Sequence, residues 1–136
     1  MAKRIKNVLI DCSGSMGAQS INNQNRVQVA LDMVYDAYTE GLIDGRTLII
    51  PFNHQVMGGI NIDMLKKMSR AQVEEIFKIG GGSDIQSAIN YCNGEKTLLL
   101  TDEADISYGS FGVGITPDNI TIENLSRLKP DFRDRS

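Results

Sequence analysis

The sequence is poor in the residues that form soft-metal sites or covalent cross-links. Its 136 residues include a single histidine, His54, and two cysteines, Cys12 and Cys92, which are not spaced as a Cys-x-x-Cys pair. Zinc sites in proteins need several nitrogen or sulfur ligands, so the sequence does not predict a histidine-based zinc site. Two isolated cysteines give no disulfide framework, and we expect both to be free thiols in a reducing, cytoplasmic setting.

Long apolar stretches and an excess of positive charge are also missing. No apolar run approaches the roughly 20 residues that cross a membrane. The short run near the start is interrupted by Asp11, which does not fit a signal peptide. With 14 basic and 17 acidic residues, the net charge is −3, and this gives no footprint for nucleic acid. The sequence therefore predicts neither a membrane protein nor a nucleic-acid-binding protein.

Strand-like and helix-like segments alternate along the chain. Short apolar runs predict buried strands at 5–10, 46–52 and 96–101. Apolar residues at three- and four-residue steps predict helices at 25–42 and from residue 85 onward. This alternation predicts an α/β fold with a doubly wound, mostly parallel sheet and helices on both faces.

The remaining segments are expected to complete one domain. Residues 56–62 are predicted to form an antiparallel edge strand next to 46–52, a strand that Pro51 is expected to fray or end. The rest of the chain adds a helix over about 70–78 with Ser69 and Gln72 as a capping box, a strand at 110–116, and a last helix over 121–129 that Pro130 ends. We expect a single domain over 1–136, with a core over about 5–129 and a flexible tail over 130–136.

Polar side chains gather in three loops that adjoin these elements. The segment "DCSGSMG" places Asp11, Ser13 and Ser15 after the first strand, "GGGSD" places Ser83 at the start of a helix, and Asp102 follows the strand at 96–101. Parallel strands end at the same edge of a sheet, so we expect the five side chains to meet there. Carboxylate and hydroxyl oxygens are hard ligands, which suit Mg²⁺ or Mn²⁺. A polar turn with a helix cap is the simpler alternative for the first loop.

In their order, the three motifs resemble the von Willebrand factor A domain and its metal-ion-dependent adhesion site. That site has the pattern Asp-x-Ser-x-Ser, then a Thr in a glycine-rich loop before a helix, then Thr-Asp. Here "DCSGSMG", "GGGSDIQSAI" and "LLLTDEAD" follow in the same order, and the resemblance covers about Lys6 to Ile115. It implies that Ser13 and Ser15 bind the metal directly and that Asp11 acts directly or through water.

The sequence departs from the family pattern in three ways. Ser83 stands where the family usually has Thr, so the hydroxyl is retained and a methyl group is lost. Glu103 replaces the Gly that often follows the Asp and adds negative charge near Asp102. The resemblance implies that Asp102 lies behind the direct ligands or, without a bound partner, approaches the metal. Little chain follows Ile115, so the resemblance is to a minimal, intracellular version of the domain.

The resemblance implies a protein-binding module and not an enzyme. Neutral hydroxyl ligands leave the charge of a divalent ion poorly neutralised, so the ion favours an anionic ligand from outside. In this family that ligand is typically a Glu or Asp of a partner protein. Related intracellular domains are adaptors within larger assemblies, including those of AAA+ ATPases, which is an analogy at the level of the family. By the same analogy, the helix over 121–129 would be the one that shifts when a partner binds.

A Mg²⁺-dependent phosphatase of the haloacid-dehalogenase type is the alternative function. In such enzymes an Asp at a strand end, here Asp11, attacks a phosphoryl group over Mg²⁺. That family needs a second Asp two residues later, where this sequence has Ser13, and the Lys expected after a later strand is not evident. A scaffold domain whose site no longer functions is a third alternative.

Overall fold

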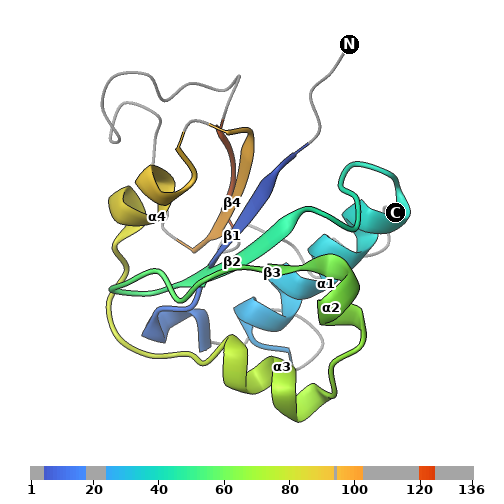
Figure 1. Ribbon diagram of the computed structural model, residues 1–136. Coiled ribbons are helices and arrows are strands. Elements are labelled where there is room, and N and C mark those ends of the chain that lie inside the picture. Colours follow the sequence, from blue (N-terminus) through green and yellow to red (C-terminus); the bar gives the residue numbers. More distant parts are fainter. Residues whose placement is uncertain (1–4, 18–23, 94, 103–119, 125–136) are drawn as a thin grey trace.

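The computed structural model describes residues 5–17, 24–93, 95–102 and 120–124 (Figure 1). Within these residues the chain forms a five-stranded sheet, four α-helices and one turn of 3₁₀ helix. The elements follow in the order β1 (Asn7–Asp11), η1 (Gly14–Gly17), α1 (Arg26–Thr39), β2 (Leu48–Phe52), β3 (Ile60–Asn61), α2 (Ile62–Lys66), α3 (Arg70–Ile76), α4 (Ile85–Tyr91), β4 (Thr97–Thr101) and β5 (Ile120–Asn124).

The sheet is mixed and mostly parallel, as the sequence predicts. Its strand order is β3-β2-β1-β4-β5. Strand β1 is central and pairs in parallel with β2 on one side and β4 on the other, β5 is parallel to β4, and β3 is antiparallel to β2. The chain moves outward from β1 to β2 and β3 and then crosses back to β4. The strand order therefore reverses beside β1, where open α/β sheets commonly place ligands.

Helices cover both faces of the sheet because the buried strands alternate their side chains between two cores (Figure 1). Val8 and Ile10 of β1 lie in the core that contains the apolar stripe of α1, whereas Leu9 lies in the core that contains α4. All five residues of β1 are buried. Figure 1 shows α1, α2 and α3 on one side of the sheet and α4 on the other. A strand buried on both faces explains the unbroken apolar run in the sequence.

The helices predicted at 25–42, about 70–78 and from residue 85 onward are confirmed as α1, α3 and α4, each with a side-chain cap at its start. In α1 the Asn25 side chain accepts from the Gln28 N–H while the Gln28 side chain accepts from the Asn25 N–H, which is a capping box. The predicted capping box of Ser69 and Gln72 is present at α3. Asp84 caps α4 through the N–H of Ser87. Each cap gives a partner to backbone N–H groups that a helix terminus leaves unpaired.

The strand predicted at 46–52 is confirmed as β2, which ends at Phe52 as predicted, but Pro51 does not fray it. Pro51 lies opposite Ile10 in the β1–β2 ladder, and β2 continues to Phe52. The Pro51 carbonyl accepts from Met57 N–H at 3.0 Å. The edge of Pro51 that bears its carbonyl and its ring nitrogen therefore faces away from β1. Proline lacks an N–H, and here its absence breaks no hydrogen bond between β2 and β1.

The antiparallel edge strand is confirmed in place but is much shorter than 56–62. Only Ile60–Asn61 forms β3, and Phe52 and Val56 make one isolated bridge. The Asn61 side chain accepts from Met64 N–H at 2.9 Å and starts α2 at Ile62, a helix that the sequence analysis did not predict. The helix cap at Asn61 therefore ends β3, although the apolar pattern that predicted the strand continues to residue 62.

The predicted helix beginning at Thr121 is wrong over the residues that the structure describes. Ile120–Asn124 is strand β5, in parallel register with β4 from Thr97↔Ile120 to Thr101↔Asn124. Ile120 and Ile122 both lie in the α4-side core, which is the two-residue period of a strand. The strand predicted at 110–116 and the rest of the predicted helix lie outside the described residues.

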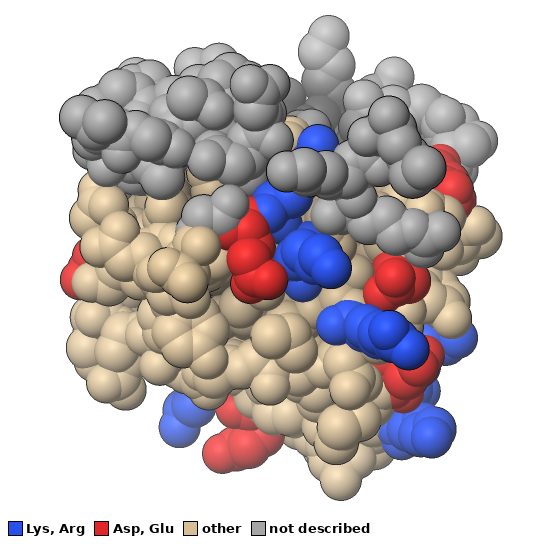
Figure 2. All heavy atoms as spheres, turned by 45° about the horizontal axis from the view of Figure 1, so that its top comes forward, with Lys and Arg blue, Asp and Glu red and all other residues tan. Residues whose placement is uncertain are grey.

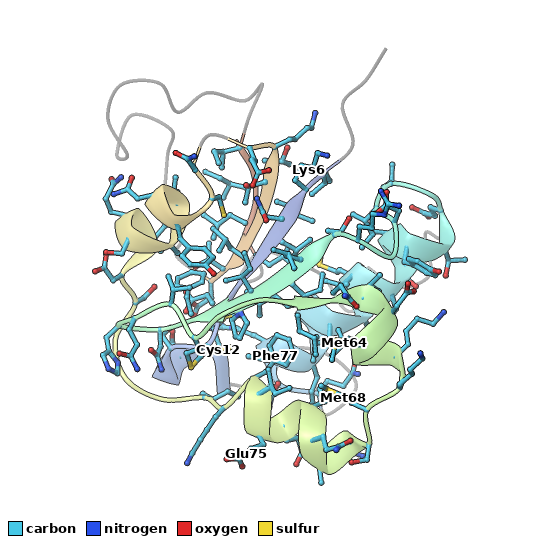
Figure 3. The ribbon with its side chains drawn as sticks, viewed as in Figure 1. Lys6, Cys12, Met64, Met68, Glu75 and Phe77 are labelled. Atoms are coloured by element: carbon cyan, nitrogen blue, oxygen red, sulfur yellow. The ribbon has the colours of Figure 1, made fainter. Side chains whose placement is uncertain are left out.

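The described part of the chain also shows the state of the cysteines, the character of the helices and the distribution of surface charge. Cys12 and Cys92 are free and buried, as expected (Figure 3 shows Cys12 beside the carboxyl end of β1). Among the described helices, none has the length and apolar character needed to cross a membrane. Figure 2 shows acidic and basic side chains interspersed on one face of the molecule.

Candidate metal site

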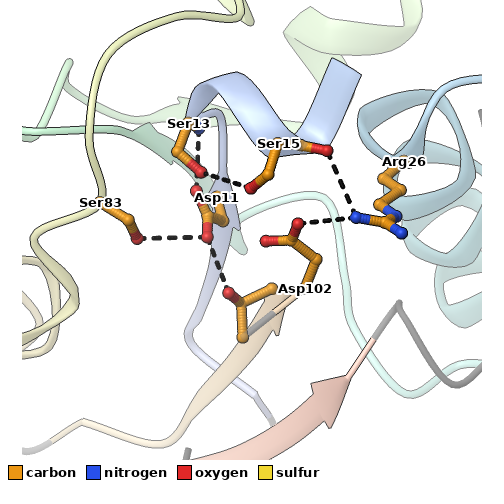
Figure 4. Close-up of polar contacts among 7 residues, drawn as sticks. Asp11, Ser13, Ser15, Arg26, Ser83 and Asp102 are labelled. Atoms are coloured by element: carbon orange, nitrogen blue, oxygen red, sulfur yellow. Dashed lines mark hydrogen bonds and ion pairs between the residues drawn. The ribbon is translucent and has the colours of Figure 1, made fainter. Parts of the chain in front are cut away.

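The carboxylate of Asp11 is the centre of a polar cluster at the carboxyl end of β1 (Figure 4). Asp11 is fully buried. Its Oδ1 accepts from the Ser13 N–H at 2.8 Å, and its Oδ2 accepts from the hydroxyls of Ser83 at 3.2 Å and Thr101 at 2.7 Å. The three donors come from three separate segments of the chain. A buried carboxylate needs such donors, since an unpaired buried charge is strongly unfavourable.

Ser13 and Ser15 present their hydroxyls together on the loop that follows β1. The hydrogen bond from the Ser13 N–H to Asp11 closes an Asx turn, and Gly14–Gly17 then forms one turn of 3₁₀ helix. The Ser13 and Ser15 Oγ atoms are 3.4 Å apart. Ser13 is buried, while Ser15 is exposed. One hydroxyl therefore lies beside the buried Asp11 and the other at the surface.

The glycine-rich loop at 80–83 is fastened to the first loop by backbone hydrogen bonds. Gly80 N–H donates to the Cys12 carbonyl at 2.9 Å, and Gly14 N–H donates to the Gly81 carbonyl at 3.0 Å. Gly81 has a φ of +76°, and a Cβ at this position would lie 2.8 Å from His54 Nδ1. Both the left-handed backbone and the close approach require glycine here. This docking brings Ser83 within hydrogen-bonding distance of Asp11.

Asp102, which directly follows β4, is paired with Arg26. Arg26 Nη1 donates to Asp102 Oδ2 at 2.8 Å. The same nitrogen also donates to the Ser15 carbonyl oxygen at 3.3 Å. The side chain of Asp102 is 7% exposed and that of Arg26 is 23% exposed. Arg26 is the first residue of α1, so the cap at Asn25 fixes the position of the Arg26 backbone.

Cys12 lies between Asp11 and Ser13 but points into the core on the α1 side. Burial, together with the negative charge of Asp11, raises the pKa of the Cys12 thiol from an ordinary 9.0 to about 12. The thiol is therefore neutral near pH 7. A neutral, fully buried thiol does not act as a nucleophile.

All five residues predicted for the metal site belong to one connected cluster. Asp11 contacts Ser13 and Ser83, Ser13 contacts Ser15, and Arg26 joins Ser15 to Asp102. In the described part of the chain, no three His, Cys, Asp or Glu side chains come together as a site of those residue types would require. A cation bound here would depend on hydroxyl as well as carboxylate oxygens. That donor set suits a hard ion such as Mg²⁺ or Mn²⁺.

Two members of the cluster were not predicted as site residues. Thr101 ends β4 with a polar side chain directly before Asp102, so a hydroxyl at the end of a buried strand was a usable signal. Arg26 gave no comparable signal, because its partner lies 76 positions away in the sequence. Comparison of the chain with protein families, curated proteins and solved structures finds no match.

Proposed function

We propose that this chain is a metal-dependent protein-binding module of the von Willebrand A type, with a doubly wound sheet and a site for Mg²⁺ or Mn²⁺. The observation that carries the proposal is the convergence on Asp11 of the Ser13 N–H and of hydroxyls from the glycine-rich loop and the end of β4. The Ser13 hydroxyl lies beside that of Ser15 on the loop after β1. The fold class and this cluster support the family assignment that the three sequence motifs suggest.

The oxygens of Ser13, Ser15 and Ser83 would hold the ion, with Asp11 and Asp102 supplying the negative charge nearby. Both carboxylates already have strong partners, since Asp11 accepts three hydrogen bonds and Asp102 pairs with Arg26. A carboxylate with such partners donates less charge to a metal. The bound ion supplies Lewis acidity, and its incompletely neutralised charge would favour a carboxylate from another molecule.

The partner would therefore present an Asp or Glu side chain to the surface near Ser15, the exposed hydroxyl of the set. An adaptor role in a larger cytoplasmic assembly, such as one containing an AAA+ ATPase, is the biological setting that the family analogy suggests. The two free, buried thiols agree with a reducing compartment.

The contacts of Asp11 favour binding over phosphoryl transfer. A nucleophilic carboxylate needs an oxygen that can reach the substrate, whereas Asp11 is fully buried and both of its oxygens accept hydrogen bonds from the protein. Position 13, where the phosphatase reading requires an acid, holds Ser13. A chain that hydrolyses an aryl phosphate in Mg²⁺, and loses that activity in Asp11→Asn, would establish the phosphatase instead.

Isothermal titration calorimetry with Mg²⁺ and with Mn²⁺ tests the metal site directly. We expect one site in the wild type, with binding lost in Asp11→Ala and weakened in Ser13→Ala. Ser69→Ala, the same chemical change at the cap of α3, is the control and should bind as the wild type does. Pull-downs with and without EDTA would then test partner binding, with Ser13→Ala as the metal-site control. Absence of metal binding in the folded wild type would leave only the scaffold reading.

A further inference from the structure

The ion pair between Arg26 and Asp102 lies inside the candidate metal site and is not explained by it. Asp102 is one of the two carboxylates in the cluster, and its side chain is almost completely shielded from water. The Arg26 Nη1 is 2.8 Å from Asp102 Oδ2. At this distance and exposure, the attraction is only weakly screened by solvent. A cation supplied by the protein therefore already holds an acid that a metal ion would use.

The same guanidinium is also tied to the loop that carries the metal-binding hydroxyls. Its Nη1 donates to the carbonyl of Ser15. Its Nε is buried and has no hydrogen-bond partner among the described groups. An unpartnered buried N–H is unfavourable, and such groups in folded proteins are concentrated at functional sites. The Arg26 Nε therefore agrees with a role of this side chain in the site.

We propose that Arg26 is a positioning residue that competes with the metal ion for Asp102. By holding this carboxylate, Arg26 weakens the binding of a cation to the chain alone and keeps a bound ion poorly neutralised. A poorly neutralised ion binds an external carboxylate more strongly. The inference rests on the proposed function, because it concerns the regulation of that same site.

The decisive variant is Arg26→Gln, which removes the positive charge and releases Asp102. We expect it to bind Mg²⁺ and Mn²⁺ about tenfold more tightly than the wild type by calorimetry, because the variant removes a positive charge that repels the ion and frees Asp102 to attract it. Arg26→Lys retains the charge and should stay within about threefold of the wild type. In Arg26→Gln/Asp102→Asn the gain should disappear, which would show that it passes through Asp102.

Arg70→Gln is the matched control. Arg70 pairs with Glu74 on α3, where both side chains are largely exposed, so the variant makes the same chemical change away from the site. Its metal affinity should equal that of the wild type. Thermal unfolding without metal checks that each variant is folded, and Arg26→Met, which keeps an unbranched apolar stem, replaces Arg26→Gln if the latter unfolds.

The outcomes separate this inference from the proposed function. Metal binding by the wild type, with unchanged or weaker binding by folded Arg26→Gln and Arg26→Met, would overturn the inference and leave the metal site intact. A gain that persists in the double variant would also overturn it. If neither the wild type nor the folded Arg26 variants bind Mg²⁺ or Mn²⁺, both proposals fail.

Discussion

Thr101 donates its hydroxyl to Asp11 Oδ2 at 2.7 Å and so joins the carboxyl ends of β4 and β1. Both residues are fully buried. The bond is the shortest of the three that Asp11 accepts, and its donor comes from the neighbouring strand of the sheet. Strand pairing therefore sets this part of the cluster, while loops supply the other two donors.

Replacing Thr101 by Val should destabilise the protein by about 1.5–3 kcal/mol, because a buried carboxylate loses a hydrogen bond. Thr101→Ser keeps the hydroxyl and loses one methyl group, so it should cost about 1 kcal/mol. Urea unfolding of the three proteins measures the difference. Equal destabilisation by Val and Ser would contradict the importance of this hydrogen bond.

Gly81→Ala should destabilise the protein by about 1–2 kcal/mol or more, since alanine at a φ of +76° is strained and its Cβ would approach His54 closely. Gly82→Ala is the neighbouring control, because a Cβ there meets no atom within 4 Å. The comparison requires urea unfolding of both variants. We also expect Gly81→Ala, and not Gly82→Ala, to weaken metal binding by displacing Ser83; similar behaviour of the two variants would argue against this account of the loop.

Ser83→Ala should weaken Mg²⁺ binding by about 10-fold or more, because losing an oxygen proposed to hold the ion should cost at least as much as losing a group that only orients a ligand. The variant removes the hydroxyl that donates to Asp11 Oδ2 at 3.2 Å. Ser83→Thr keeps the hydroxyl and adds only a methyl group, so its affinity should remain close to that of the wild type. Calorimetry on the two variants decides the question, and an equal loss in both would show that the hydroxyl is not the relevant group.

The raised pKa of the Cys12 thiol predicts a loss of stability at alkaline pH. The folded protein keeps this proton up to about pH 12, whereas the unfolded chain releases it near 9.0. The contribution is therefore fully present below pH 9 and is lost as the pH rises toward 12. Between pH 8 and pH 10 this amounts to about 1.4 kcal/mol.

Urea unfolding of the wild type and Cys12→Ala across this pH range isolates the contribution of the thiol. The free energy of unfolding of the wild type should fall by about 1.4 kcal/mol more than that of the variant between pH 8 and pH 10. Parallel pH profiles would show that the thiol does not titrate as its burial requires. The same burial predicts that thiol reagents modify native Cys12 at pH 8 only very slowly.

The parts of the fold that could be predicted from sequence are those whose signal is local. The unbroken apolar run at 8–10 indicated a strand buried on both faces, and Ser69 with Gln72 indicated where α3 begins. Strand β5 could not be identified in this way, because Thr121 looks like a helix cap and Ile122 begins a helical spacing. Pairing with β4 decides the conformation of this segment, and such pairing is a tertiary effect.

The same distinction between local signals and tertiary effects applies to the residues of the candidate site. Side chains at strand ends, such as Asp11 and Asp102, could be predicted to meet, because parallel strands place their carboxyl ends together. Arg26 could not, since nothing local to a helix start indicates a partner on a distant strand. The contact exists only because α1 packs against the face of the sheet that carries Val8 and Ile10.

The central place of β1 has a consequence for how the protein is made. On the ribosome β1 is synthesised before both of its neighbours, β2 and β4, and β4 ends only at Thr101. Pairings between distant segments form slowly, and an apolar strand without neighbours is prone to aggregate. Val8, Leu9 and Ile10 therefore lack one of the two strands that flank them in the folded protein until translation has passed residue 101.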